Sequence, residues 1–229
     1  VEKLEKRLTQ QLSTDSQEIS ELLKQHPQLL TLLNEKTDLP DMEPTRVMEL
    51  LEKNIQQDFP STASVDFEIR SVHKSMEEFY LTPPMDTGAP NVIYINHGRQ
   101  ISNLELFTTL AHEGFPGHLY QTVYFGRQSP SHIRYLIDYS GYVEGWATYV
   151  ESYAYDYLSA GTLSSQEASA CTRLSWLNRS VNLCIYSLLD VGIHYHGWTP
   201  AQAARFLNLF GIRDAAVTAE IYRYITETP

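Results

Sequence analysis

The chain has little cysteine, few basic residues and no long apolar run, and each shortage excludes a class of protein. Its 17 lysines and arginines stand against 28 acidic residues, which gives a formal net charge of −11. Nucleic-acid-binding domains favour a basic surface, so this balance argues against nucleic acid as a partner. No apolar run approaches the roughly 20 residues of a membrane-spanning helix, so no such segment is expected in this chain.

The two cysteines, Cys171 and Cys184, fall on one expected helix. Thirteen residues of helix rise about 20 Å, whereas the Cα atoms of a disulfide lie within about 7 Å of each other. A disulfide between them is therefore excluded, and two buried free thiols are expected. The 229 residues suit one domain, or one domain with a small appendage.

One motif dominates the sequence, His112-Glu113-Gly114-Phe115-Pro116-Gly117-His118. It is a variant of the zinc-protease signature His-Glu-x-x-His, whose histidines lie on one helix face and whose glutamate is a general base. Here the histidines are six residues apart, and six residues of straight helix turn about 600°, which would separate them. Pro116 and Gly117 favour a kink or bulge that brings them together. The alternative is a solvent-facing helix end that holds two histidines.

The residues before the motif favour the metal site. Apolar residues at helical spacing, with Ser102 or Asn103 as N-cap, predict a helix from about Asn103 to Gly114. This helix would deliver His112 and Glu113 at its end. A buried polar pair without a partner costs stability, and a metal ion would supply that partner.

A third metal ligand is expected from a downstream helix. Glu144 and Glu151 are seven residues apart, so their side chains point in roughly the same direction. Glu144, between two glycines and close to Trp146, suits a metal ligand. Glu151 suits a carboxylate that orients a ligand histidine through its second ring N–H. The alternative for both is a solvated helix face, where acidic residues usually lie.

The stretched histidine motif and the segment Glu144-Gly145-Trp146-Ala147 together resemble a large bacterial family, domain of unknown function 885, which is grouped with the zincin-like metallopeptidases. Other matching segments are 80–86, 91–96 and 190–199, so the resemblance runs from about Phe79 to the C-terminus. It implies a zinc-dependent peptidase domain that binds one zinc ion through His112, His118 and Glu144, with Glu113 as base. Family members continue beyond the last segment of this chain, so a fragment of a longer bacterial protein is expected.

The expected fold is mainly α with a small β element, in a zincin-like metallopeptidase domain. We expect an N-terminal helical segment over residues 1–60 and a catalytic domain, truncated at its C-terminus, over residues 61–229. Helices are expected over 1–12, 15–25, 45–57, 103–114, 142–158, 165–192, 200–209 and 213–226, and strands over 65–70 and 91–96. By the resemblance, strand 91–96 lies along the active-site cleft and pairs with extended substrate. An ordinary core strand is the alternative.

Four further residues are candidates for the site. His194, just past a long apolar helix, would stabilise an oxyanion, although a helix C-terminus also favours histidine through the helix dipole. Tyr142 and Tyr149 are expected to line a cleft, and Asn96 to contact substrate or support the ligands. Tyrosines on helices more often pack in the core.

The sequence therefore predicts a zinc peptidase that hydrolyses peptide bonds through a metal-activated water, with Glu113 as general base. The alternative is a non-catalytic helical domain that binds a peptide or a protein and carries a degenerate metal site. A di-iron bundle is disfavoured because it needs paired Glu-x-x-His motifs, which the sequence lacks. The oligomeric state is left open. The compartment is open between the cytoplasm and secretion or cell-envelope attachment of the full-length protein.

Overall fold

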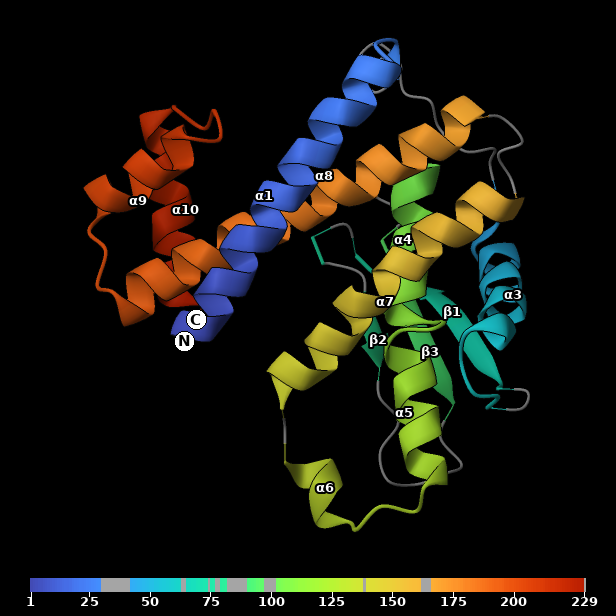
Figure 1. Cartoon of the computed structure of the whole chain (residues 1–229). Coiled ribbons are helices and arrows are strands. Elements are labelled where there is room, and N and C mark those ends of the chain that lie inside the picture. The colour runs from blue at the N-terminus through green and yellow to red at the C-terminus, as the bar shows by residue number, and fades with distance from the viewer. Residues whose placement is uncertain are drawn as a thin grey trace. The chain divides into compact units, whose positions relative to one another are not determined.

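The computed structural model describes residues 1–29, 42–62, 65–73, 75–76, 79–81, 90–96, 102–137, 139–161 and 166–228 (Figure 1). The chain forms two compact units, a terminal unit of residues 1–32 and 173–229 and a central unit of residues 33–172. The predicted fold class, mainly α with a small β element, is confirmed. The predicted domain boundary between residues 60 and 61 differs from this division. The predicted boundary separates domains that fold independently. The division into compact units does not test independent folding, so the boundary stays a prediction.

The central unit contains the predicted motif. Its elements are α3 (Pro44–Asn54), the 3₁₀ helix η1 (Ile55–Gln57), β1 (Phe67–Ser71), β2 (Phe79–Leu81), β3 (Asn91–Ile95), α4 (Asn103–Glu113), α5 (His118–Arg127), α6 (Ile133–Leu136), α7 (Ser140–Gly161) and the start of α8 (Gln166–Asp190). The side chain of Ser102 caps α4 by accepting a hydrogen bond from the Glu105 N–H. Of the two N-caps considered for this helix, the structure selects Ser102.

The three strands form one sheet in the order β1-β3-β2. β1 pairs with β3 in parallel, and β2 pairs with β3 antiparallel. β3 is the central strand, because β1 occupies one of its edges and β2 the other. An extended substrate therefore cannot pair with β3 as the sequence suggested, and the alternative of a core strand is the one observed. Val92, Ile93 and Ile95 of β3 are buried.

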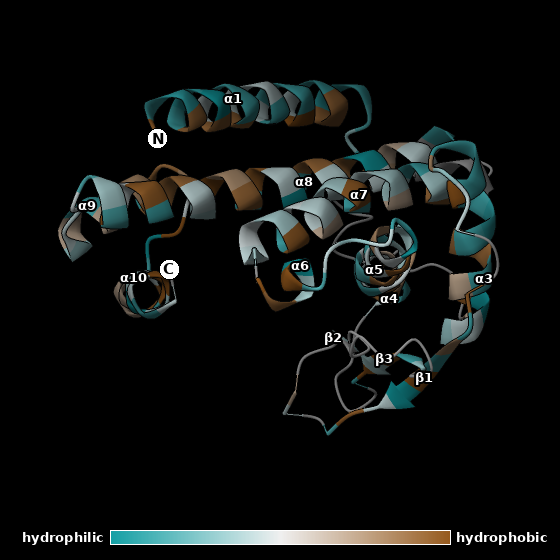
Figure 2. Ribbon diagram, turned by 90° about the horizontal axis from the view of Figure 1, so that it is seen from below, coloured by the Kyte–Doolittle hydropathy of each residue, from teal (hydrophilic) through white to brown (hydrophobic). Residues whose placement is uncertain are grey.

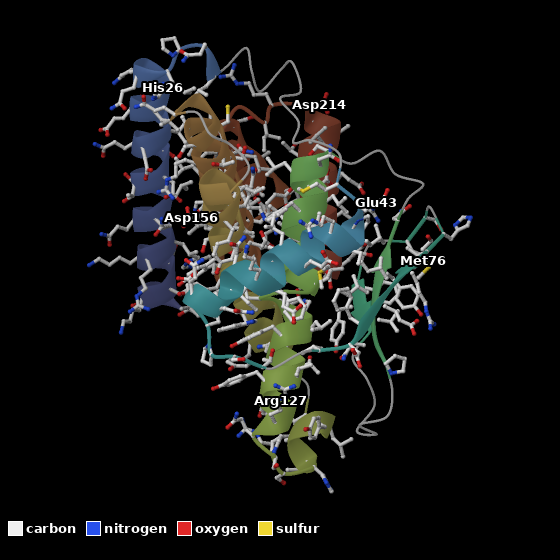
Figure 3. The ribbon with its side chains drawn as sticks, turned by 90° about the vertical axis from the view of Figure 1, so that its right-hand side faces the viewer. His26, Glu43, Met76, Arg127, Asp156 and Asp214 are labelled. Atoms are coloured by element: carbon white, nitrogen blue, oxygen red, sulfur yellow. The ribbon has the colours of Figure 1, made fainter. Side chains whose placement is uncertain are left out.

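The helices of the central unit form a layer on this sheet. Figure 2 shows α4 and α5 between α7 and the sheet, and α4 contacts both α3 and α7. Phe107, Leu110 and Ala111 of α4 are fully buried, and they join one apolar core with the sheet and with α3, α5 and α7. This burial, at about 25 cal/mol per Å² of apolar surface, holds α4 and the motif at its end in place. α6 lies beyond the C-terminal end of α5, where Arg127 ends that helix (Figures 1 and 3).

The terminal unit is a separate helical assembly. It contains α1 (Glu2–Gln25), α8 from Arg173 onward, the π-helical turn η2 (Val191–Tyr195), α9 (Pro200–Asn208) and α10 (Ala215–Glu227). Thr199 caps α9 in a capping box with Gln202, and Pro200 occupies the first turn, which confirms the predicted helix start. An apolar core joins α1, α8, η2, α9 and α10. Both cysteines lie on α8 and are free; Cys184, in this unit, is buried as expected, whereas Cys171, in the central unit, is only partly buried.

Several elements differ from the expectation. α1 is one continuous helix rather than two, and β2, α5 and α6 were not predicted. Strands β1 and β3 match the predicted strands to within two residues at their ends. A search of the described helices finds none with the length and apolar character that crossing a membrane requires.

Candidate metal centre

The motif folds as a tight turn between α4 and α5. The Gly117 N–H donates to the Ala111 carbonyl at 2.9 Å, and the Tyr120 N–H donates to the Gly114 carbonyl at 3.1 Å. A Cβ at Gly117 would lie 1.7 Å from the His112 carbonyl oxygen, so only glycine allows this approach. The turn starts α5 at His118 and returns that residue to the side of His112, and the bend expected at Pro116 and Gly117 is thus present.

The two histidines of the motif meet the carboxylate of Glu144 on α7. The imidazole rings of His112 and His118 lie edge to face, with centroids 4.7 Å apart. Glu144 Oε2 lies 3.4 Å from Nε2 of His112, and Glu144 Oε1 lies 3.5 Å from Nε2 of His118. The three predicted ligands, which come from three different helices, are therefore together.

Glu151 holds the other side of the His112 ring. Its carboxylate is buried and lies 2.7 Å from Nδ1 of His112. A carboxylate there accepts the Nδ1–H, which leaves the Nε2 lone pair directed toward Glu144. Burial lowers the pKa of His112, but the hydrogen bond to Glu151 and the negative charges of Glu113, Glu151 and Glu144 outweigh it, so the pKa is raised.

His118 has a different environment. Burial and the neighbouring His112 lower the pKa of its imidazole, and the opposing effect of Glu144 does not restore it. Nδ1 of His118 is buried, and no hydrogen-bond partner for it occurs among the described residues. His118 is thus the more readily neutral of the two rings, and a neutral imidazole presents a lone pair.

Glu113 lies between the sheet and the two histidines. Its Oε2 accepts a hydrogen bond of 2.8 Å from the Tyr80 N–H on the edge strand β2. One donor atom from each of His112, Glu113 and His118 lies within 4.8 Å of the other two. The carboxylate is close enough to act on a group held at the histidines, or to serve as a ligand itself.

These donors fit a zinc ion. Zinc takes imidazole nitrogen and carboxylate oxygen at about 2.0–2.2 Å, so two ligand atoms of a tetrahedral site lie about 3.3–3.5 Å apart. Each histidine lies at that spacing from one oxygen of Glu144, His112 at 3.4 Å from Oε2 and His118 at 3.5 Å from Oε1. The Glu151–His112 hydrogen bond supplies the carboxylate–histidine pairing typical of zinc sites. His118 departs from that pattern because no such partner for its Nδ1 is found in the described part of the chain.

The other predicted site residues lie elsewhere, and their roles stay predictions. Tyr142 and Tyr149 are exposed on α7, and the Tyr149 hydroxyl lies 3.0 Å from that of Tyr153. Asn96 is buried, and its Nδ2 donates to the Met76 carbonyl at 2.7 Å. His194 belongs to the terminal unit, where its Nε2 lies 2.9 Å from the Ile225 carbonyl oxygen and 3.6 Å from Asp190 Oδ1.

Two contributors were not predicted. The Trp146 Nε1–H donates to the Pro116 carbonyl at 2.9 Å and so ties α7 to the turn. From the sequence, Trp146 was named only as a neighbour of Glu144. The second contributor is the backbone N–H of Tyr80, which no side-chain pattern reveals.

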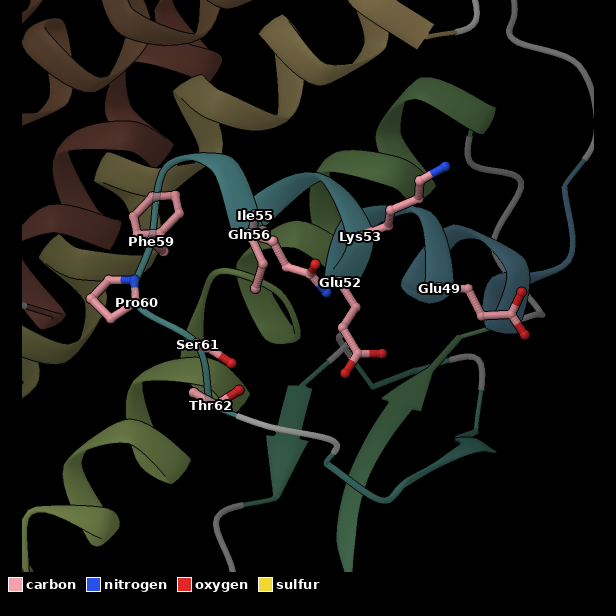
Figure 4. A pocket seen from close by; sticks show the side chains of 9 residues that line it. All are labelled: Glu49, Glu52, Lys53, Ile55, Gln56, Phe59, Pro60, Ser61 and Thr62. Carbon is pink, nitrogen blue, oxygen red and sulfur yellow. The ribbon is translucent and has the colours of Figure 1, made fainter.

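A pocket of about 330 Å³ lies on another part of the central unit (Figure 4). Its lining comes from α3, η1 and the segment that follows: Glu49, Glu52, Lys53, Ile55, Gln56, Phe59, Pro60, Ser61 and Thr62. Burial raises the pKa of Glu52. None of the predicted site residues lines this pocket, so the candidate metal centre is distinct from it.

Comparison with known proteins identifies the family of this chain. No curated protein matches the sequence. Two solved structures are similar in fold, each described as a "putative lipoprotein": one from Colwellia psychrerythraea (22% identity, TM-score 0.63) and one, of unknown function, from Shewanella oneidensis (18% identity, TM-score 0.58). They cover 95% and 97% of this chain, which spans 41% and 46% of theirs. The family described as "Bacterial protein of unknown function (DUF885)" matches residues 1–229, and the chain therefore belongs to that family.

Proposed function

We propose that the chain carries the zinc site of a zincin-like peptidase. The convergence of Glu144 on Nε2 of both His112 and His118, at 3.4 and 3.5 Å, carries this proposal. His112, His118 and Glu144 would hold the ion, and Glu151 would orient His112. A zinc ion bound there supplies a Lewis acid that polarises a carbonyl and lowers the pKa of water.

Glu113 is the proposed general base. The Tyr80 N–H fixes the direction of its carboxylate through Oε2. A carboxylate at this position takes a proton from the attacking water and returns it to the leaving amine of the peptide. The nearby ring of His112, whose pKa is raised by its carboxylate neighbours, is held by Glu151 and is not needed as the base.

The description of the two similar structures as lipoproteins supports a cell-envelope location for the longer protein. A peptidase there would meet peptides or exposed segments of envelope proteins. The proposed substrate is accordingly a peptide bond, with the sequence preference left to experiment.

Peptide hydrolysis by the full-length protein tests the proposal. Wild-type protein loaded with zinc is compared with Glu113→Gln and with Asp156→Asn, an exposed carboxylate on α7, on a mixture of unstructured peptides followed by mass spectrometry. We expect cleavage by wild type and Asp156→Asn, and none by Glu113→Gln although it retains zinc. Zinc binding without any cleavage would favour the non-catalytic binding domain. Loss of zinc from Glu113→Gln would make Glu113 a ligand and overturn its role as base.

A further inference from the structure

A second surface of the central unit is unusually apolar. Of the large hydrophobic side chains that are exposed in the described chain, six fall within residues 133–142: Ile133, Tyr135, Leu136, Ile137, Tyr139 and Tyr142. We call these six residues the α6 patch. Leu136 is 71% exposed and Tyr142 is 72% exposed, values far above those of core residues. Contiguous exposed apolar residues of this kind mark an interaction surface.

The patch is held out from the body of the central unit. α6 lies beyond the end of α5, and Figure 2 shows hydrophobic residues on it. Two contacts with Phe125 anchor α6: the Tyr135 ring packs edge to face on the Phe125 ring at 5.5 Å, and the Arg134 guanidinium lies over the same ring at 5.5 Å. A short anchored helix that presents Leu136 outward suits insertion into a soft surface better than it suits a preformed peptide groove.

The charge around the patch selects the partner. The chain has 28 acidic residues in 229, yet residues 114–137 contain none, and Asp138 is the one acidic residue within 133–142. The same stretch contains Arg127 and Arg134, both exposed, and His132 next to α6. Figure 3 places Arg127 at the end of α5, next to α6. Arginines beside exposed aliphatic and tyrosine side chains form the composition of an interfacial anchor, in which the apolar groups enter the headgroup region and the cations meet anionic lipid.

We propose that the α6 patch docks the central unit onto an anionic phospholipid surface. Leu136, Ile133 and Ile137 enter the interface, the tyrosines lie at headgroup level, and Arg127 and Arg134 contact lipid phosphates. This inference does not rest on the zinc site, and removal of zinc leaves it unchanged.

Vesicle sedimentation tests the proposal with the whole chain. The vesicles are phosphatidylcholine alone, or an equimolar mixture of phosphatidylcholine and phosphatidylglycerol. We expect binding to the mixed vesicles, weaker binding to phosphatidylcholine alone, and a loss of about tenfold or more in partition for the double variant Leu136→Ser, Ile137→Ser. Arg134→Gln weakens binding to the mixed vesicles and not to phosphatidylcholine.

Leu209→Ser is the matched control, because Leu209 is 78% exposed but lies in the terminal unit. It keeps wild-type binding, and circular dichroism verifies that every variant is folded. Equal binding by wild type and the double variant, or no binding to either vesicle, would overturn the proposal. So would light scattering that shows self-association of the wild type, lost in the double variant, since the patch would then be an interface between copies of the chain.

Discussion

Glu151 on α7 accepts a hydrogen bond of 2.7 Å from Nδ1 of His112 on α4. Glu144, two helical turns earlier on α7, lies 3.4 Å from Nε2 of the same ring through its Oε2. The two carboxylates therefore contact the imidazole ring of His112 at both of its nitrogens. Their spacing of seven residues, two helix turns, brings both to one face of α7.

Glu151→Gln tests the hydrogen bond between the buried Glu151 carboxylate and His112. The amide keeps the size of the side chain but removes the charge that fixes the ring and its tautomer, so zinc affinity falls about 10- to 100-fold. Asp156→Asn, an exposed carboxylate on the same helix, leaves affinity unchanged. Titration with a competing zinc chelator measures both. Wild-type affinity in Glu151→Gln would show that the buried carboxylate serves only the fold.

Gly117→Ala tests the turn. The added Cβ would meet the His112 carbonyl oxygen at 1.7 Å, and an overpacked backbone contact costs about 3 kcal/mol of unfolding free energy. The zinc affinity falls as well as the unfolding free energy, because the clash displaces His118 from His112.

Gly145→Ala is the control for that experiment. Gly145 is next to Glu144 on α7, and a Cβ there meets nothing within 4 Å. In a helix, alanine in place of glycine raises stability by up to about 1 kcal/mol. Urea unfolding of both variants separates the two effects. Equal stability of Gly117→Ala and wild type would contradict the turn geometry.

A buried polar contact joins α1 to α8 in the terminal unit. Asp15 is 3% exposed, and its carboxylate accepts hydrogen bonds from Ser180 Oγ at 2.6 Å and Gln11 Nε2 at 2.7 Å. Ser180→Ala removes one of them and lowers the unfolding free energy by about 1–3 kcal/mol. Thr14→Ala, which removes only an exposed intrahelical bond, costs much less. Similar losses in urea unfolding for the two variants would argue against the buried contact.

The ion pair of Glu18 and Arg173 predicts a pH dependence. The guanidinium donates to both carboxylate oxygens, at 2.6 and 2.8 Å, and this hydrogen bonding lowers the pKa of Glu18. Its stabilisation is full above the pKa of the unfolded chain and is lost as the pH falls through the lower folded pKa. The stability difference between wild type and Glu18→Gln, measured by urea unfolding, thus shrinks from about pH 7 to about pH 3. The pair is partly exposed, so the difference is small at any pH. A difference that grows on acidification would contradict the assignment.

Much of the site followed from residue spacing. The six-residue separation of His112 and His118 required a bend, and Pro116 and Gly117 supplied one. The helix around Glu144 and Glu151 was expected to present both carboxylates together, and they meet one ring. Residue spacing could not predict the three-dimensional path of the turn. In the structure the turn is held by a hydrogen bond from the Trp146 side chain to the Pro116 carbonyl.

The misassigned elements have physical reasons. α1 was expected as two helices, over residues 1–12 and 15–25, and the segment between and after them holds hydroxyl and acidic residues, whose side chains can compete with helical hydrogen bonds. It continues because the hydroxyls of Thr14 and Ser16 bond back to carbonyls four residues earlier, while Asp15 is satisfied by Ser180 across the helix pair. Strand β2 has three residues, too few for an alternating pattern to be visible.

The zinc content of the purified chain tests the central claim most directly. Elemental mass spectrometry would compare wild type, His112→Ala and Glu144→Ala after incubation with zinc and removal of the excess. The three-ligand site predicts about one zinc per chain in the wild type and a loss in both variants. No zinc in the wild type, or full retention in both variants, would contradict the site.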